Sequence, residues 1–256
     1  MSSLRLDHVT RRFGGLVAVD DVSLDISGEG ITAIIGPNGA GKTTLFNIIS
    51  GFAAPSAGRV VFSGEDITGM APEAIAGRGI VRTFQLAQLF DDLTVLENVK
   101  VGRHLHTSGG LLAALTPFRA TRIEAAVEAA AGHLLEQVGL SAQADMRASV
   151  LPYGQKRLLE ITRALAAEPR LLLLDEPAAG LNRDETTRLA ALLRQIAVAG
   201  TAVLLIEHDM GLVMTVAERI SVLDFGRLIA TGTPSEVRQN RDVIAAYLGT
   251  AEAAHA

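Results

Sequence analysis

A glycine-rich stretch at residues 36–43 constrains the fold of this chain more than any other feature. Its sequence, GPNGAGKT, fits the pattern G-x-x-x-x-G-K-[ST]. It follows the apolar run 31–35, which predicts a buried strand, and precedes residues 44–50, which are apolar at helical spacing and end at Gly51. A strand, a glycine loop and a helix in this order are the context in which the pattern binds phosphate. The sequence therefore predicts an α/β nucleotide-binding core.

The residue types in this loop match the chemistry of phosphate binding. Glycines let backbone N–H groups converge on phosphate oxygens, and the helix N-terminus adds unpaired donors and a positive dipole end. Lys42 can reach the β- and γ-phosphates, and the hydroxyl of Thr43 can ligate Mg²⁺. We predict that a nucleoside triphosphate binds here. The predicted contact residues are Pro37, Asn38, Gly39, Ala40, Gly41, Lys42, Thr43 and Thr44.

Composition excludes several other classes of protein. Of the 256 residues 48% are hydrophobic, yet no run approaches the roughly 20 apolar residues that span a bilayer. The first residues lack the basic and apolar regions of a signal peptide, so we expect none. The absence of cysteine excludes disulfides and thiolate zinc sites. A net charge of −5 and 4% aromatic residues argue against nucleic-acid binding.

The order of the expected elements predicts one α/β domain with an insertion. Residues 4–9 alternate like an edge strand, and buried strands at 171–174 and 201–207 alternate with helices. This pattern predicts a mostly parallel sheet, an N-terminal antiparallel β part and an inserted α-helical subdomain, in which Thr94 and Glu97 form a capping box. We expect a single domain, 1–256, with its core at 1–84 and 166–256 and its helical subdomain at 85–165. Other expected elements are strands at 17–26 and 57–64, helices at 121–138, 156–167, 184–199, 210–217 and 242–248, and a hairpin at 220–230.

Acidic residues follow one of the predicted buried strands. Asp175 would hold Mg²⁺ at the carboxyl end of this strand, and Glu176 could polarise the water that attacks the γ-phosphate. Gln85 could ligate Mg²⁺, and His208, after strand 201–207, could donate to the γ-phosphate. The residues alone leave open a surface glutamine and a structural histidine at these two positions.

A second glycine-containing helix start occurs at LPYGQ, residues 151–155. It could also face phosphate, because a helix N-terminus carries free backbone donors. One chain needs only one such site for one nucleotide. The segment therefore indicates closure over a nucleotide bound by another copy.

These segments together resemble the ATP-binding subunits of ABC transporters along essentially the whole chain. GPNGAGKTT at 36–44, Gln85, LPYGQ at 151–155, LLLLDEP at 171–177, AAGLN at 178–182 and His208 are similar to the family's Walker A, Q-loop, signature, Walker B, D-loop and switch histidine. The resemblance implies ATP hydrolysis with Mg²⁺ and a head-to-tail dimer of identical or different subunits. In such a dimer Tyr153, Gly154 and Gln155 of one subunit would close over ATP on the other. Phe13 stands where the family stacks an aromatic ring on adenine.

The resemblance is strongest to the branched-chain (hydrophobic) amino acid uptake group, in RTFQ at 82–85, the insertion 102–118, LLIEHDM at 204–210 and AYLG at 246–249. It implies permease subunits, an extracytoplasmic substrate-binding protein, no nucleic acid, and a peripheral position on the cytoplasmic face of the cell membrane. Pro152 replaces a common serine, and Asn182 replaces the usual aspartate. A lipid or lipopolysaccharide exporter, a soluble ABC protein and a P-loop kinase are the alternatives. The apolar residues of the insertion could form subdomain core or a permease contact.

Overall fold

The computed structural model of the chain describes residues 3–83, 89–103 and 117–253. Its contacts divide the chain into two compact units, residues 1–82 with 170–179 and 186–256, and residues 83–169 with 180–185. The domain boundaries expected at 84 and 165 stay a prediction. Gln85 and most of the insertion 102–118 lie outside the described residues. Within those described ranges no helix is both long and apolar enough to cross a bilayer.

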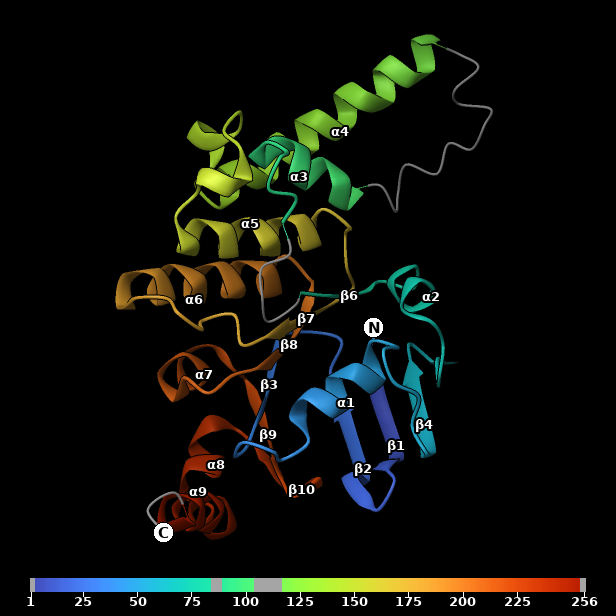
Figure 1. Cartoon of the computed structure of the whole chain (residues 1–256), viewed down its shortest axis with the longest axis vertical. Coiled ribbons are helices and arrows are strands. Elements are labelled where there is room, and N and C mark those ends of the chain that lie inside the picture. The colour runs from blue at the N-terminus through green and yellow to red at the C-terminus, as the bar shows by residue number, and fades with distance from the viewer. Residues whose placement is uncertain (1–2, 84–88, 104–116, 254–256) are drawn as a thin grey trace. The chain divides into compact units, whose positions relative to one another are not determined.

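The first unit contains a six-stranded sheet in the order β10-β9-β3-β8-β7-β6 (Figure 1). Its strands are parallel except for the β9–β10 hairpin. Strands β3, β7 and β8 are buried at every position, which is why their sequences are continuous apolar runs. The strands are β3 (Ile31–Ile35), β6 (Ile80–Arg82), β7 (Leu171–Asp175), β8 (Ala202–Ile206), β9 (Arg219–Asp224) and β10 (Arg227–Gly232).

A second, antiparallel sheet in this unit has the order β2-β1-β4-β5. Its strands are β1 (Leu4–Phe13), β2 (Leu16–Ile26), β4 (Ala57–Phe62) and β5 (Glu65–Asp66). The expectation of an edge strand at residues 4–9 is wrong, because β1 pairs with both β2 and β4. Alternating apolar and polar residues indicate a strand with one buried and one solvated face. They do not distinguish an edge strand from an interior strand of an antiparallel sheet, because both can have these two faces. Strand β1 also continues to Phe13, four residues beyond the range 4–9 expected for it.

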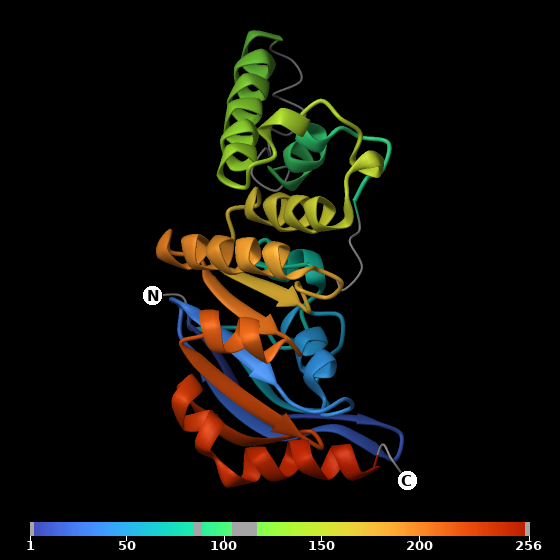
Figure 2. The ribbon, with the colours of Figure 1, turned by 90° about the vertical axis from the view of Figure 1, so that its left-hand side faces the viewer.

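Helices cover the sheets of the first unit. The apolar face of α1 packs Leu45, Phe46 and Ile49 into the main core. Figure 2 shows α8 and α9 beside β9 and β10, against which they pack. The helices are α1 (Lys42–Ile49), α2 (Pro72–Ala76), α6 (Arg183–Val198), α7 (Met210–Val216), α8 (Pro234–Gln239) and α9 (Arg241–Ala253). Helix α8 was not predicted, although Thr233 and Glu236 form its capping box.

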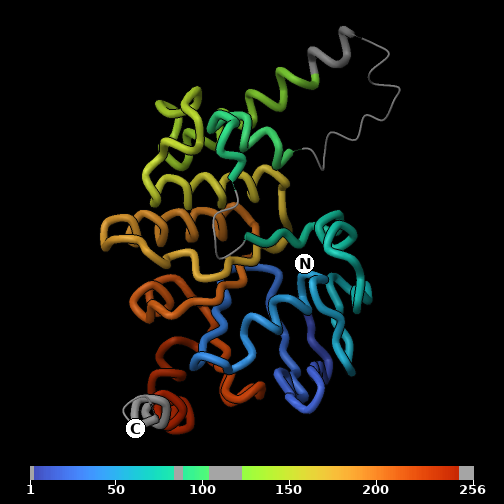
Figure 3. The backbone as a smooth tube through the Cα atoms, in the orientation of Figure 1, coloured from blue at the N-terminus to red at the C-terminus, as the bar shows by residue number. Residues whose placement is uncertain are grey.

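The second unit consists of helices, traced in Figure 3: α3 (Val95–Gly102), α4 (Pro117–Gln137) and α5 (Tyr153–Leu165), with short 3₁₀ turns at Ser141–Gln143 and Ala148–Val150. These helices share an apolar core that includes Val99, Leu135 and Leu159. The predicted capping box of Thr94 and Glu97 begins α3 and is confirmed.

Candidate nucleotide-binding site

The glycine loop lies between the central strand β3 and helix α1, as the sequence predicted. Gly36 and Gly41 have positive φ values of 151° and 98°. A Cβ on Gly36 would collide with the carbonyl oxygen of Leu223, and one on Gly41 with that of Ala18. Only glycine fits these two positions, because the loop is packed tightly against backbone from other strands. This packing leaves α1 with its free N-terminal N–H groups at the loop.

Lys42 is buried at the start of α1 and held by the loop that it follows. Its ammonium donates hydrogen bonds to the carbonyl oxygens of Gly36, at 2.7 Å, and Pro37, at 2.9 Å. Burial lowers the pKa of this ammonium, whereas the nearby carboxylates of Glu176 and Asp175 raise it. The two hydrogen bonds therefore hold the side chain of Lys42 in the loop.

Asp175, the last residue of β7, is buried in an ion pair with Arg82 on the neighbouring strand β6. The Nη2 atom of Arg82 lies 2.8 Å from Oδ2 of Asp175. The Nη1 atom of Arg82 also donates to Asn47 Oδ1, at 2.7 Å, and to Ser50 Oγ, at 3.0 Å. Arg82 thus joins the acidic strand to α1. It belongs to the quoted RTFQ segment, but the sequence assigned it no role because its partners are distant in the chain.

Glu176 and His208 meet at the carboxyl ends of β7 and β8. Oε1 of Glu176 lies 2.6 Å from Nε2 of His208. The backbone of Glu176 has φ +46°, a left-handed conformation that costs a non-glycine residue free energy. Its N–H donates to the carbonyl oxygen of Ile206, at 2.9 Å, which ties this turn to β8. The structure therefore brings together two side chains that the sequence had placed 32 residues apart.

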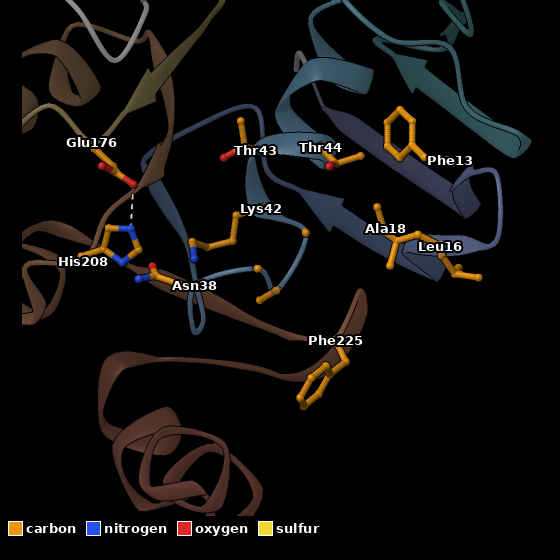
Figure 4. A pocket seen from close by; sticks show the side chains of 14 residues that line it. Phe13, Leu16, Ala18, Asn38, Lys42, Thr43, Thr44, Glu176, His208 and Phe225 are labelled. Carbon is orange, nitrogen blue, oxygen red and sulfur yellow. Dashed lines mark hydrogen bonds and ion pairs between the residues drawn. The ribbon is translucent and has the colours of Figure 1, made fainter. Parts of the chain in front are cut away.

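A cavity of about 440 Å³ extends along the glycine loop and Lys42 to Glu176 and His208. In Figure 4, Glu176 and His208 lie on one side of Lys42, whereas Phe13 and Leu16 lie on the other. The predicted residues that line it are Phe13, Asn38, Gly39, Ala40, Gly41, Lys42, Thr43, Thr44, Glu176 and His208. Leu16, Val17, Ala18 and Phe225 also line it and were missed by the sequence analysis.

The residues missed by the sequence analysis lie at the start of β2 and, for Phe225, in the turn between β9 and β10, which tertiary hydrogen bonds hold at the loop. The N–H of Gly226 donates to Ala40 O, at 3.0 Å, and the N–H of Asp20 donates to Gly226 O, at 2.8 Å. These bonds join segments far apart in the chain, so no local sequence signal could have found them.

Tyr153, Gly154 and Gln155 form the first turn of α5, in the second unit. The helix begins three residues earlier than expected, because Pro152 serves as its N-cap. Gly154 is buried against Glu185, where a Cβ would collide with the Glu185 carboxylate. Asn182, which replaces the usual aspartate, accepts from the N–H groups of Asp184 and Glu185, both at 3.0 Å. An amide therefore still caps the start of α6.

The fold and the site define a P-loop nucleoside triphosphatase. The phosphate loop follows the central parallel strand β3. The acidic residues Asp175 and Glu176 lie at the end of β7, which only β8 separates from β3 in the sheet. The sequence model of the family described as "ABC transporter" matches residues 19–179. A model described as "Branched-chain amino acid ATP-binding cassette transporter" matches residues 227–253.

Comparisons with individual proteins agree with this class. The chain is 47% identical to the high-affinity branched-chain amino acid transport ATP-binding protein BraF of Pseudomonas aeruginosa, over 97% of this chain and 98% of BraF. It is 45% identical to LivG of Escherichia coli K12, with the same coverage. A nucleotide-free ATP-binding cassette from an ABC transporter matches with a TM-score of 0.83 and 34% identity, over 96% of this chain and 99% of that one. The chain therefore belongs to the ABC transporter family, as an ATP-binding subunit that hydrolyses ATP.

Proposed function

We propose that this chain is the ATP-hydrolysing subunit of a membrane importer for branched-chain or other hydrophobic amino acids. The observation that carries the proposal is the likeness to BraF and LivG along almost their whole length, since both are named as branched-chain amino acid transport ATP-binding proteins. The separate match at residues 227–253 supports the same group from a segment outside the phosphate loop and the acidic pair.

The position of Lys42 supports its role at the phosphates of ATP. Its ammonium is held by two loop carbonyls beside the free N–H groups of α1. Phosphate oxygens replace those carbonyls as acceptors when ATP binds, and charge-assisted bonds of this kind are strong. Phe13, 48% exposed at the other end of the cavity, stacks on the adenine ring.

Glu176 is the proposed general base. It accepts a proton from the water that attacks the γ-phosphorus, while the bond from this phosphorus to the bridging oxygen breaks and ADP leaves. In the structure its carboxylate is bonded to His208. A γ-phosphate offers His208 a more highly charged acceptor, which frees the Glu176 carboxylate to bind the attacking water.

Two oxygen-bearing side chains near the phosphate loop suit Mg²⁺, Thr43 on the cavity wall and Asp175 buried at the end of β7. Thr43 offers a hydroxyl, and Asp175 offers a carboxylate. Oxygen atoms are the ligands that Mg²⁺ prefers, and one or two protein carboxylates commonly hold it together with oxygens of phosphate and water. Gln85 is the proposed third protein ligand. When bound, the ion supplies positive charge beside the β- and γ-phosphates.

We further propose that ATP is hydrolysed between two ATP-binding subunits. A solved relative, 25% identical with a TM-score of 0.76, is a dimer in a post-hydrolysis state bound to ADP and phosphate. The exposed ring of Tyr153 and the backbone at Gly154 and Gln155, at the N-terminus of α5, supply the closing surface. The partner is a second copy or a different ATP-binding subunit.

The transporter role implies further partners: transmembrane permease subunits, and through them an extracytoplasmic substrate-binding protein. The chain then lies on the cytoplasmic face of the cell membrane as a peripheral subunit.

Transport by the purified complex tests this proposal. The chain is purified with its membrane partners and reconstituted in liposomes with the binding protein, and uptake of labelled leucine is measured with and without ATP. We expect uptake that needs ATP and is lost with Lys42→Ala. Uptake of no branched-chain, aromatic or other hydrophobic amino acid, or co-purification with lipid-export components, would overturn the assignment.

A further inference from the structure

The carboxylate of Glu207 is buried next to the site without being part of the cavity. Glu207 directly follows β8 and is 3% exposed. It does not line the cavity, and within the described ranges of the chain it forms no ion pair. Burial of a carboxylate costs several kcal/mol unless hydrogen bonds compensate it. The hydrogen bonds of Glu207 therefore indicate its structural role.

Both oxygens of Glu207 accept hydrogen bonds from backbone. Oε1 accepts from the N–H of Ala178, at 2.7 Å, in the segment after β7. Oε2 accepts from the N–H groups of His208, at 2.7 Å, and Asp209, at 3.1 Å, in the segment after β8. A carboxylate is an acceptor at both oxygens, so a single side chain can serve both segments. Glutamine cannot do so, because its NH₂ group would face an N–H on one side.

The two segments that Glu207 joins carry the proposed catalytic pair. Glu176 lies two residues before Ala178, and His208 follows Glu207 directly. Oε1 of Glu176 and Nε2 of His208 lie 2.6 Å apart. The separation of the two backbones determines whether the pair can form this bond.

The backbone of Glu176 needs such support. Its φ of +46° persists only where surrounding contacts hold it. The bond from Ala178 to Glu207 fixes the end of this turn, and the bond from the Glu176 N–H to Ile206 fixes its start. Asp209 then caps α7 through the N–H of Leu212, at 3.1 Å.

Several other carboxylates of the described residues bind backbone N–H groups only two or three positions away in the chain, as Asp66 does with Thr68. Glu97 and Glu236 do so in exposed capping boxes, each within one turn. Glu207 differs because it is buried and its two oxygens serve segments on both sides of one reacting pair.

We propose that Glu207 is a positioning residue for ATP hydrolysis, which holds the Glu176 and His208 segments at the separation that the reaction needs. The inference rests on the proposed roles of Glu176 and His208. Glu207 acts through these residues and contacts no part of the nucleotide.

A double-mutant cycle tests this inference in the assembled transporter. ATP turnover is measured for the wild type, Glu207→Gln, His208→Ala and the double variant. Glu207→Gln should lower kcat about 10- to 100-fold with KM for ATP nearly unchanged, because misplacement by about 1 Å has effects of this size. The combined loss in the double variant should be smaller than the product of the two single losses, because the separation of Glu176 and His208 matters only while both side chains are present.

Two further variants separate positioning from folding. Glu236→Gln makes the same chemical change in another carboxylate that accepts from a backbone N–H, outside the cavity, and should leave kcat unchanged. Glu207→Asp keeps both acceptors on a shorter side chain and should recover part of the kcat lost with glutamine. If Glu207→Gln does not fold, the cycle is run with Glu207→Asp. Additive effects of the two substitutions, or unchanged kcat in the Glu207 variants, would overturn the inference. Normal turnover of His208→Ala would instead contradict the proposed role of His208.

Discussion

Arg82 Nη2 lies 2.8 Å from Asp175 Oδ2, and both side chains are almost completely buried. The pair joins the neighbouring strands β6 and β7, and Nη1 of Arg82 donates to Asn47 of α1 and to Ser50 at the end of that helix. The phosphate-loop helix and the acidic strand are therefore coupled through one guanidinium. The stability of the fold therefore depends on this ion pair, because a buried charge is costly without its partner.

Removing Arg82 should destabilise the protein strongly. We expect Arg82→Met to lower the free energy of unfolding by roughly 3–5 kcal/mol, because it removes the guanidinium that lies 2.8 Å from the buried Asp175 carboxylate. Arg59→Met is the control, since its pair with Asp7 is exposed and should contribute less than about 1 kcal/mol. Urea denaturation of both variants measures the difference. Equal small losses would contradict the importance of the buried pair.

Lys42→Ala should weaken ATP binding. The loss of a charge-assisted contact costs roughly 1.5–3 kcal/mol, which is about a 10- to 100-fold rise in Kd. Titration calorimetry with ATP and a non-hydrolysing analogue checks this value. Lys100→Ala is the matched control, because Lys100 pairs with glutamates of α4 and lies outside the cavity. Unchanged affinity for Lys42→Ala would refute the loop assignment.

Phe13 should report nucleotide binding by fluorescence. The chain contains no tryptophan, so Phe13→Trp introduces one emitter at the cavity. We expect ATP to quench it, because adenine stacks on the ring, and Phe13→Ala to cost roughly 1–3 kcal/mol of binding. Val198→Trp, at a position 89% exposed and outside the cavity, should not respond. Equal responses of the two tryptophans would argue against stacking at Phe13.

Gln155 should affect ATP turnover by the assembled transporter without affecting the binding of ATP to the isolated chain. If this residue acts on ATP held by another subunit, Gln155→Ala leaves the Kd of the isolated chain unchanged and lowers kcat of the assembled transporter. Binding is measured by calorimetry at low protein concentration, and turnover by phosphate release. A weaker Kd in the isolated chain would place Gln155 in the site of its own subunit.

The parts of the fold that the sequence predicted are those with local signals. The buried strands β3, β7 and β8 are continuous apolar runs, and Gly36 and Gly41 are required by local backbone geometry and close packing. Helix α8 was missed although its capping box is local, so a fuller reading of Thr233 and Glu236 would have found it.

The parts that were not predicted depend on contacts between distant segments. Arg82 and Asp175 are separated by 93 residues, and no local sequence pattern at either position indicates their contact. Phe225 reaches the cavity only because the β9–β10 hairpin is bonded to the phosphate loop. The same holds for Glu207, whose position before His208 is visible in the sequence but whose bond to Ala178 is not.

The most direct test of the account is ATP turnover by Glu176→Gln. The amide cannot accept a proton from water, yet it keeps the size of the side chain and leaves Lys42 and the loop intact. After incubation with ATP and Mg²⁺ and removal of free nucleotide, we predict bound, uncleaved ATP, a dimer, and turnover at least about 100-fold below wild type. Bound ADP with near-normal phosphate release would contradict the assignment of Glu176 as the base.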